Sequence, residues 1–257
     1  EDSMMPNIVA IGSSPLITNE ISHLWNTLVH NVFPVQEILT TDIPYPEADI
    51  YICAPSQREL IKNIPSDKLY TVELAPTSSF FLQISTIPKN SDIYLFNNQH
   101  IYIASLISYC QEIGLTDYQY IPIAFDEEPR DIVIAKLKSA RYIIGVDKFI
   151  ESELEQGPFS TYINKEQISL LKAKRTLAFK DICKVLSAIA DYYLQQNIPA
   201  DKIQHITRII SDITVQALAS QADLQGTIES NTTNQGTYPK ETLKKLQQLL
   251  QEISLKQ

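Results

Sequence analysis

Small, hydroxyl and amide residues follow several short apolar runs in this chain of 257 residues. Hydroxyl groups and unpaired backbone N–H groups at helix starts bind carboxylates and phosphates. We therefore take these residues as candidates for holding a small ligand, with ordinary helix capping as the alternative at each position. The candidates are Gly12, Ser13, Ser14, Pro55, Ser56, Thr77, Ser78, Ser79, Asn97, Asn98, His100 and Gly145.

Motifs for catalysis, phosphate loops and metals are missing from the sequence. It contains no G-x-x-x-x-G-K-[ST], no G-x-G-x-x-G, no G-x-S-x-G and no H-E-x-x-H. The four histidines have no metal-ligand spacing, although His100 follows Asn97 and Asn98 closely. The acidic run 126–128 opens a predicted helix, where carboxylates favourably meet the helix dipole. We therefore expect no catalytic residue, no metal and no cofactor.

The charge of the chain is unevenly distributed. Residues 165–257 contain 12 Lys and Arg against 9 Asp and Glu, whereas the preceding 164 residues contain 9 against 21. An acidic body repels phosphates, so we expect no direct contact with nucleic acid. Cys53, Cys110 and Cys183 are far apart in apolar surroundings, which favours buried, reduced thiols.

Short β-type runs alternate with helical spacing over the first 150 residues. Helical spacing marks the stretches 99–114, with Gly114 as a C-cap, and 127–140. Such alternation predicts an α/β fold with a parallel, doubly wound sheet, whose strand ends gather the candidate residues at one edge. The predicted strands are Asn7–Ile11, Val35–Leu39, Asp49–Cys53, Tyr70–Ala75, Asp92–Phe96, Tyr118–Ala124 and Arg141–Val146.

The α/β pattern covers residues 6–164 and predicts a domain of two lobes. The lobes would be 6–65 and 70–164, with the crossing at 65–69. A single continuous sheet is the alternative.

Residues 165–257 are predicted to be helical. Apolar residues spaced alternately three and four apart form a heptad seam on a helix over 165–196, and a second seam follows Pro199. A polar linker at 226–239 and a final amphipathic helix complete this part. The seams predict a homodimer through a coiled coil, with packing of the helices within one chain as the alternative.

The run from Tyr70 to Glu151 resembles the N-terminal sensor region of bacterial transcription activators of the propionate-catabolism-regulator type. The segments that bear the likeness are Glu73–Phe81, Ile87–Asn98, Glu112–Gly114, Ala140–Val146 and Ala173–Arg175. The resemblance covers about a third of the chain. It implies a two-lobed α/β domain that binds a small metabolite in the cleft between its lobes, and a following helix that passes the signal to output domains.

The sequence thus favours a dimeric sensor domain of a transcription regulator, with a metabolite bearing a carboxylate or phosphate as ligand. An enzyme on a doubly wound sheet and a ligand-free scaffold are the alternatives. No apolar run approaches the ~20 residues of a membrane span, and the start of the chain does not resemble a signal peptide. We therefore expect no membrane partner and a cytoplasmic location.

Overall fold

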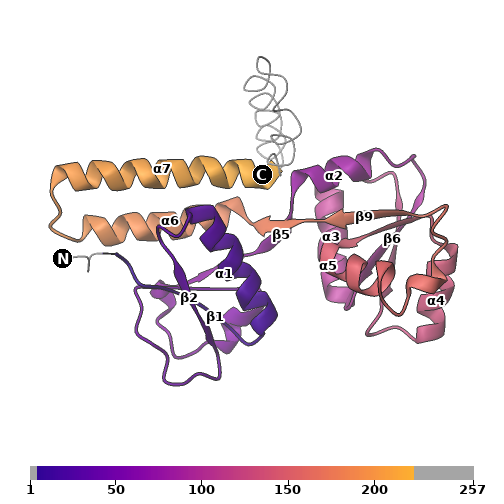
Figure 1. Ribbon diagram of the computed structural model, residues 1–257, viewed down its shortest axis with the longest axis horizontal. Helices are drawn as coiled ribbons and strands as arrows, with labels where there is room; N and C mark the ends of the chain where they lie inside the picture. The colour runs from indigo at the N-terminus through magenta and orange to yellow at the C-terminus, as the bar shows by residue number, and fades with distance from the viewer. Residues whose placement is uncertain (1–4, 223–257) are drawn as a thin grey trace, which may run out of the picture. The chain divides into compact units, whose positions relative to one another are not determined.

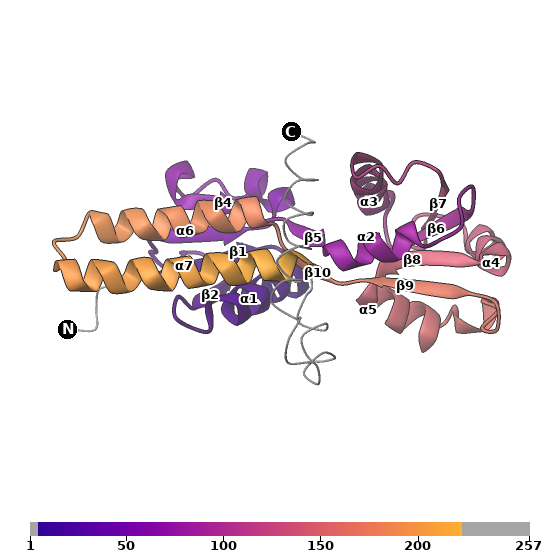
Figure 2. The same ribbon diagram turned by 90° about the horizontal axis from the view of Figure 1, so that it is seen from above.

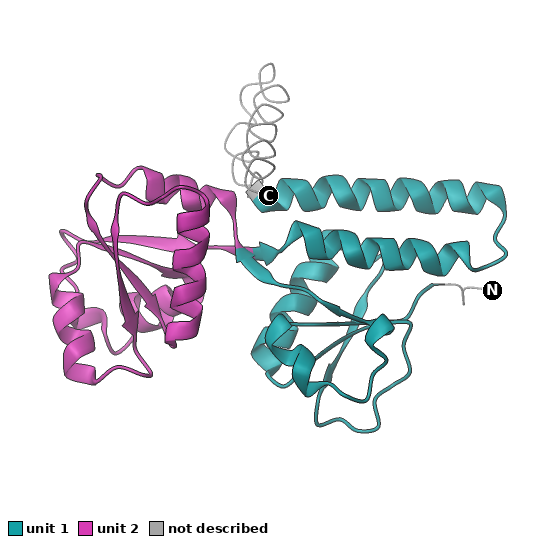
Figure 3. Ribbon diagram, turned by 180° about the vertical axis from the view of Figure 1, so that it is seen from behind, with its two compact units in different colours: residues 1–75, 176–228 teal, residues 76–175, 229–257 magenta. Residues whose placement is uncertain are grey.

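The computed structural model describes residues 5–222, which form two compact units (Figures 1 and 3). Within the described chain, unit 1 comprises residues 5–75 and 176–222, and unit 2 comprises the continuous segment 76–175. Unit 2 is therefore inserted into the sequence of unit 1. The predicted polar linker at 226–239 and the final amphipathic helix lie outside the described residues.

Unit 1 contains a parallel sheet of four strands, namely β1 (Ile8–Gly12), β2 (Val35–Leu39), β3 (Ile50–Cys53) and β4 (Leu69–Thr71). Their order is β2-β1-β3-β4. Every residue of β1 and β3 is buried, because the sheet is covered on both faces and its central strands must be apolar on both sides.

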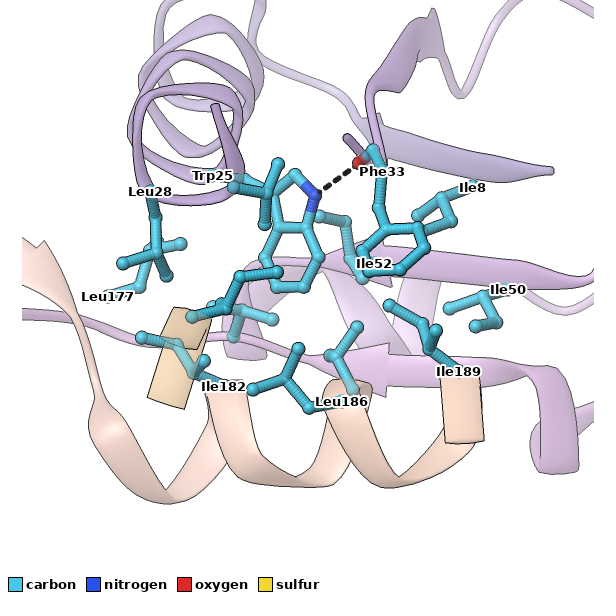
Figure 4. Packing of buried hydrophobic residues seen from close by; sticks show 14 of the residues in the cluster. Ile8, Trp25, Leu28, Phe33, Ile50, Ile52, Leu177, Ile182, Leu186 and Ile189 are labelled. Atoms are coloured by element: carbon cyan, nitrogen blue, oxygen red, sulfur yellow. Dashed lines mark hydrogen bonds between the residues drawn. The ribbon is translucent and has the colours of Figure 1, made fainter. Parts of the chain in front are cut away.

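One face of this sheet is covered by α1 (Pro15–Val29) and α6 (Phe179–Leu194), and α7 (Ala200–Ala222) packs against these two helices. Trp25 of α1 lies at the centre of the core and donates its indole N–H to the Phe33 carbonyl at 2.8 Å (Figure 4). Ile182, Leu186 and Ile189 of α6 pack into the same core. Helices α6 and α7 run side by side (Figure 2).

The opposite face of the unit 1 sheet is covered by loops and two 3₁₀ helices. These are η1 (Pro55–Leu60) and η2 (Ser66–Lys68), and Ile61 and Ile64 between them are buried. The Tyr51 hydroxyl donates to the Pro46 carbonyl at 2.6 Å and accepts the Ala48 N–H at 3.0 Å. This side chain therefore ties the loop before β3 to the sheet.

Unit 2 contains a second parallel sheet of four strands, namely β6 (Asp92–Asn97), β7 (Gln119–Ala124), β8 (Tyr142–Val146) and β9 (Ser169–Ala173). Their order is β7-β6-β8-β9, which repeats the topology of unit 1. Pro122 is accommodated within β7 because that strand lies at an edge and needs ladder donors on one side only.

Helices cover both faces of the unit 2 sheet. Helices α2 (Ser78–Ser85) and α3 (His100–Glu112) contribute Phe80, Ile84 and Ile103 to one core. On the other face lie α4 (Arg130–Ser139) and a helical stretch after β8. That stretch consists of α5 (Asp147–Phe149), the π-helix η3 (Ile150–Glu155) and the 3₁₀ helix η4 (Ser160–Tyr162).

Two short strands connect the units and pair with each other as a separate two-stranded sheet. They are β5 (Leu74–Pro76) and β10 (Arg175–Leu177). The Thr77 N–H bonds the Lys174 carbonyl at 3.0 Å, and the Ala178 N–H bonds the Glu73 carbonyl at 2.9 Å. The buried carboxylate of Asp181, in the first turn of α6, accepts the Glu73 N–H at 2.9 Å. Backbone hydrogen bonds therefore flank the β5–β10 pair on both sides.

The α/β class and the parallel sheets are confirmed, whereas the start of the helical part is not. The chain forms strands β9 and β10 over part of the helix predicted at 165–196, and α6 begins only at Phe179. Leu170 and Leu171 of β9 pack toward opposite faces of the sheet. A short strand that is apolar on both faces can also match a helical spacing. Leu171 and Arg175 lie in β9 and β10, so they do not belong to a helical seam.

The division between the units also differs from the predicted boundary. Strand β4 pairs with β3 in the first sheet, so the chain leaves unit 1 after residue 75 rather than at 65–69. The later seam residues Ile182, Val185 and Ile189 are buried in the core of their own unit. Their pattern is explained by packing within the chain, and dimerisation stays a prediction.

Substituting Leu186→Ala tests the packing of α6 on the unit 1 sheet. Leu186 is 3% exposed, so its truncation leaves a cavity and should lower the free energy of unfolding by about 3 kcal/mol. The control is Leu194→Ala in the same helix, where the side chain is 68% exposed and the change should stay within about 0.5 kcal/mol. Urea denaturation followed by the fluorescence of Trp25, the single tryptophan, reports on this core. Equal shifts for the two variants would contradict the packing.

Candidate functional site

Each sheet has a topological switch point between its two central strands, which are β1 and β3 in unit 1 and β6 and β8 in unit 2. In open parallel sheets, ligands bind beyond the strand ends at such points. We define the unit 1 rim as segments 12–14 and 54–57, and the unit 2 rim as segments 97–100, 125–128 and 146–149. The two rims belong to different units and are treated separately.

The first strand end of the unit 1 rim is closely packed. A Cβ added at Gly12 would lie 2.4 Å from Oγ1 of Thr18, so glycine is required for the first turn of α1 to approach β1. The Thr18 hydroxyl donates to the Ser14 carbonyl at 2.8 Å. Ser14 occupies the N-cap position of α1, but its side chain makes no cap hydrogen bond there. The absence of a side chain at Gly12 is therefore explained by packing.

The two neighbouring strand ends of this rim are joined by a side chain. The exposed Ser13 donates its backbone N–H to Oε1 of Gln57 at 2.9 Å, and Gln57 lies on η1, which follows β3. Pro55 and Ser56 are exposed on the same 3₁₀ helix. The candidates in 12–14 and 55–56 thus lie close together, while the N–H of Ser13 is already occupied by Gln57.

The hydroxyl cluster at the start of α2 lies beside the end of β9. Thr77 is buried, and its Oγ1 is 3.1 Å from Oγ of Ser79. Its backbone N–H bonds the Lys174 carbonyl, just after β9. Ser78 and Ser79 are half-buried. These contacts hold the crossing segment in place, and they are sufficient to explain why hydroxyl residues occur here.

The Asn97–Asn98 pair forms the centre of the unit 2 rim. Asn97 is 8% exposed, and its Oδ1 accepts the Asn98 backbone N–H at 2.7 Å. Their carbonyls accept the N–H groups of Phe125 and Asp126 at 3.0 and 3.1 Å, which extends the β6–β7 ladder past the strand ends. Asn98 itself is half-buried, so part of its side chain reaches the surface of the rim.

The Asn98 side chain carries an unfulfilled hydrogen-bonding group. Its Oδ1 is shielded from solvent, and none of the residues within 5–222 donates a hydrogen bond to it. An unsatisfied buried acceptor costs about 1–3 kcal/mol. Native structures tolerate few such groups, and each calls for a specific explanation, of which a functional role is one. Among the predicted candidates, Asn98 is the one with a buried side-chain atom to which no described residue donates a hydrogen bond.

The acidic run at 126–128 closes the rim rather than lying inside a helix. Glu127 accepts the backbone N–H of His100 at 3.0 Å. Glu128 accepts the Ala124 N–H at 2.5 Å and pairs with Lys136, whose Nζ also donates to the Pro122 carbonyl at 2.7 Å. The His100 ring lies 3.8 Å from Glu128, and its side chain is 50% exposed. These contacts fix the loop between β7 and α4 against the start of α3.

Gly145 allows close packing of η3 on β8 beneath this rim. A Cβ at Gly145 would lie 2.6 Å from the Phe96 carbonyl oxygen and 3.1 Å from Cδ1 of Ile150. The first turn of η3 can therefore pack directly onto β8 only because residue 145 has no side chain. This contact places Phe149 and Asp147 at the strand end.

Two aromatic residues at this rim were not among the predicted candidates. Phe125 and Phe149 are half-buried, with ring centroids 5.4 Å apart and planes at 76°. Phe125 also stacks on the buried Phe96 at 4.8 Å. Phe125 directly follows β7 and Phe149 lies three residues after the end of β8, so the rule that selected Asn98 extends to this pair. They give the unit 2 rim an apolar wall next to its amide pair.

Comparison of the chain with family models, curated proteins and solved structures gives no match. Among residues 5–222, no group of three or more His, Cys, Asp or Glu side chains could hold a metal ion. Within the same range, no helix is long and apolar enough to cross a membrane.

The close contact at the unit 1 rim predicts a coupled pair of substitutions. Gly12→Ala should destabilise the protein by about 1–3 kcal/mol because the new methyl group overlaps Oγ1 of Thr18. Adding Thr18→Ala removes that oxygen, so the double variant should be more stable than the sum of the single changes implies. Urea midpoints of the four proteins give this coupling. Additive effects would show that the methyl group meets a different obstacle.

The buried thiols predict slow labelling. Burial raises the pKa of Cys53 and of Cys110 to about 11, and Cys183 is only half-buried. At pH 8, a disulfide reagent such as DTNB should therefore label at most one thiol in the native protein and three in guanidinium. Cys183→Ser should abolish the native labelling.

The same thiols predict a pH dependence of stability. Because the folded-state pKa values of Cys53 and Cys110 exceed that of an unfolded thiol, the free energy of unfolding should fall as pH rises above about 8.5.

Proposed function

We propose that this chain is a small-molecule-sensing domain of a transcription regulator and that it holds its ligand at the unit 2 rim. The observation that supports this most directly is Asn98, whose buried Oδ1 has no donor among the described residues. It lies at the switch point of a parallel sheet, which is the expected ligand position. A ligand donor would satisfy a group that the protein leaves unpaired.

The composition of the rim favours binding over catalysis. The carboxylate of Glu128 is engaged by Lys136 and the Ala124 N–H, and Glu127 is engaged by the His100 N–H. These contacts occupy two of the acids of the rim. The amide pair and the phenylalanine rings are groups that position a molecule rather than transform it.

The regulatory part of the proposal rests on the family resemblance and on the contacts at the end of α7. Oγ1 of Thr176 donates to Oγ of Ser220 at 3.3 Å, and Nε2 of Gln221 donates to the Leu177 carbonyl at 2.7 Å. The last described turn of α7 is thus bonded to β10, one of the two strands that join the units. A change at that strand would therefore reach the last described turn of α7.

A thermal-shift screen of the full chain against carboxylates, amino acids, phosphorylated sugars and neutral amides tests the proposal. Binding to the native state raises Tm by mass action, by RT ln(1 + [L]/Kd) in free energy. For a compound that raises Tm, Asn98→Ala should reduce the shift, because it removes the acceptor. Gln111→Ala, at an exposed position in the last turn of α3 and far from the strand ends, is the matched control and should leave the shift unchanged.

Two outcomes would contradict this function. One is a screen in which no compound changes Tm. The other is a compound whose shift is identical in the wild type, Asn98→Ala and Gln111→Ala, because its site would then lie elsewhere.

A further inference from the structure

The ligand class can be inferred from the groups at the unit 2 rim, if that rim is the binding site as proposed above. We infer that the rim takes a neutral, planar ligand that bears a carboxamide or a similar edge with adjacent hydrogen-bond donor and acceptor. The inference rests on the Asn98 amide, the wall formed by Phe125 and Phe149, and the charge around them.

The Asn98 amide provides one acceptor and two donors on a flat group. Its Oδ1 is unpaired, and the half-buried side chain can turn about its soft terminal torsion toward a ligand. A primary carboxamide is complementary to it, because an amide N–H can reach Oδ1 while the amide oxygen accepts from Nδ2. A carboxylate or a phosphate supplies acceptors only, so it would leave Oδ1 unpaired.

The phenylalanine wall favours a ligand with an apolar, planar body. Phe125 is held by its stack on Phe96, and Phe149 meets it edge-on at 5.4 Å. Two fixed rings lose little freedom when a third ring packs against them. Phe125 and Asn98 are neighbours across the extended ladder, since the N–H groups of 125 and 126 bond the carbonyls of Asn97 and Asn98.

The charge of the rim opposes an anionic ligand. Asp126 and Glu127 are exposed, and Asp147 is half-buried beside the end of β8. Lys136 is paired with Glu128, and the Arg130 guanidinium lies 5.1 Å from the centroid of the Phe159 ring. Lys148 is the one lysine within the rim segments, which contain four acids at 126, 127, 128 and 147. Acids outnumber bases there, so a carboxylate or phosphate is repelled where a neutral amide is not.

Ligand-observed and protein-observed NMR of the full chain test the inference with three probes: nicotinamide, nicotinate and inorganic phosphate. Nicotinamide and nicotinate share a ring and differ in the amide and the carboxylate. We expect nicotinamide to give saturation transfer and to shift the side-chain amide resonances of Asn98. We expect nicotinate and phosphate to leave those resonances unchanged. Asn98→Ala should weaken nicotinamide binding about tenfold.

Phe149→Leu should also weaken nicotinamide binding, while Phe81→Leu is the matched control. Phe81 is a half-buried phenylalanine on α2, which covers the other face of the sheet. Equal binding of nicotinamide to all variants would overturn the inference. Tighter binding of nicotinate or phosphate, weakened by Asn98→Ala, would overturn the ligand class but support the proposed function. No binding of any probe or screened compound would overturn both.

Discussion

The burial of α6 against the unit 1 sheet is the contact on which the rest of this structure depends. Helix α1 packs against that face, and the connections around β3 and β4 cover the opposite face with loops and 3₁₀ turns. The strands therefore need a helix from elsewhere in the sequence. Ile182, Val185 and Ile189 supply it, and each is completely buried. The chain must return from unit 2 to provide these residues, which is why two strands connect the units.

This dependence explains what could be predicted from sequence. The strands of both sheets other than β9 could be located because runs such as Ile8–Ile11 are apolar on both sides, and the parallel arrangement followed from their alternation with helices. Strand β9 could not be recognised, because Leu170 and Leu171 face opposite cores and match a helical spacing equally well. The place where the chain leaves unit 1 depends on β4 pairing with β3, a contact that no local pattern encodes.

For the candidate site residues, the sequence predicts position but not hydrogen-bond and packing partners. Their position at strand ends could be predicted from chain order alone, because parallel strands end at one edge. Their partners could not. Gln57 occupies the Ser13 N–H across 44 residues of sequence, and Gly145 is explained by Ile150 and the Phe96 carbonyl. Asn98 differs from the others only in lacking a donor, and such a property is visible only once every neighbour is in place.

The insertion of one unit within the other has a consequence for biosynthesis. Within the described residues, unit 2 is the continuous segment 76–175, so this segment can fold on the ribosome soon after β9 emerges. Unit 1 begins first but finishes last, because its core waits for α6, more than one hundred residues after β4. At about 5–20 residues per second, β1 to β4 stay without that cover for about 5–20 seconds. During this interval their apolar face is open to chaperones and to misassembly.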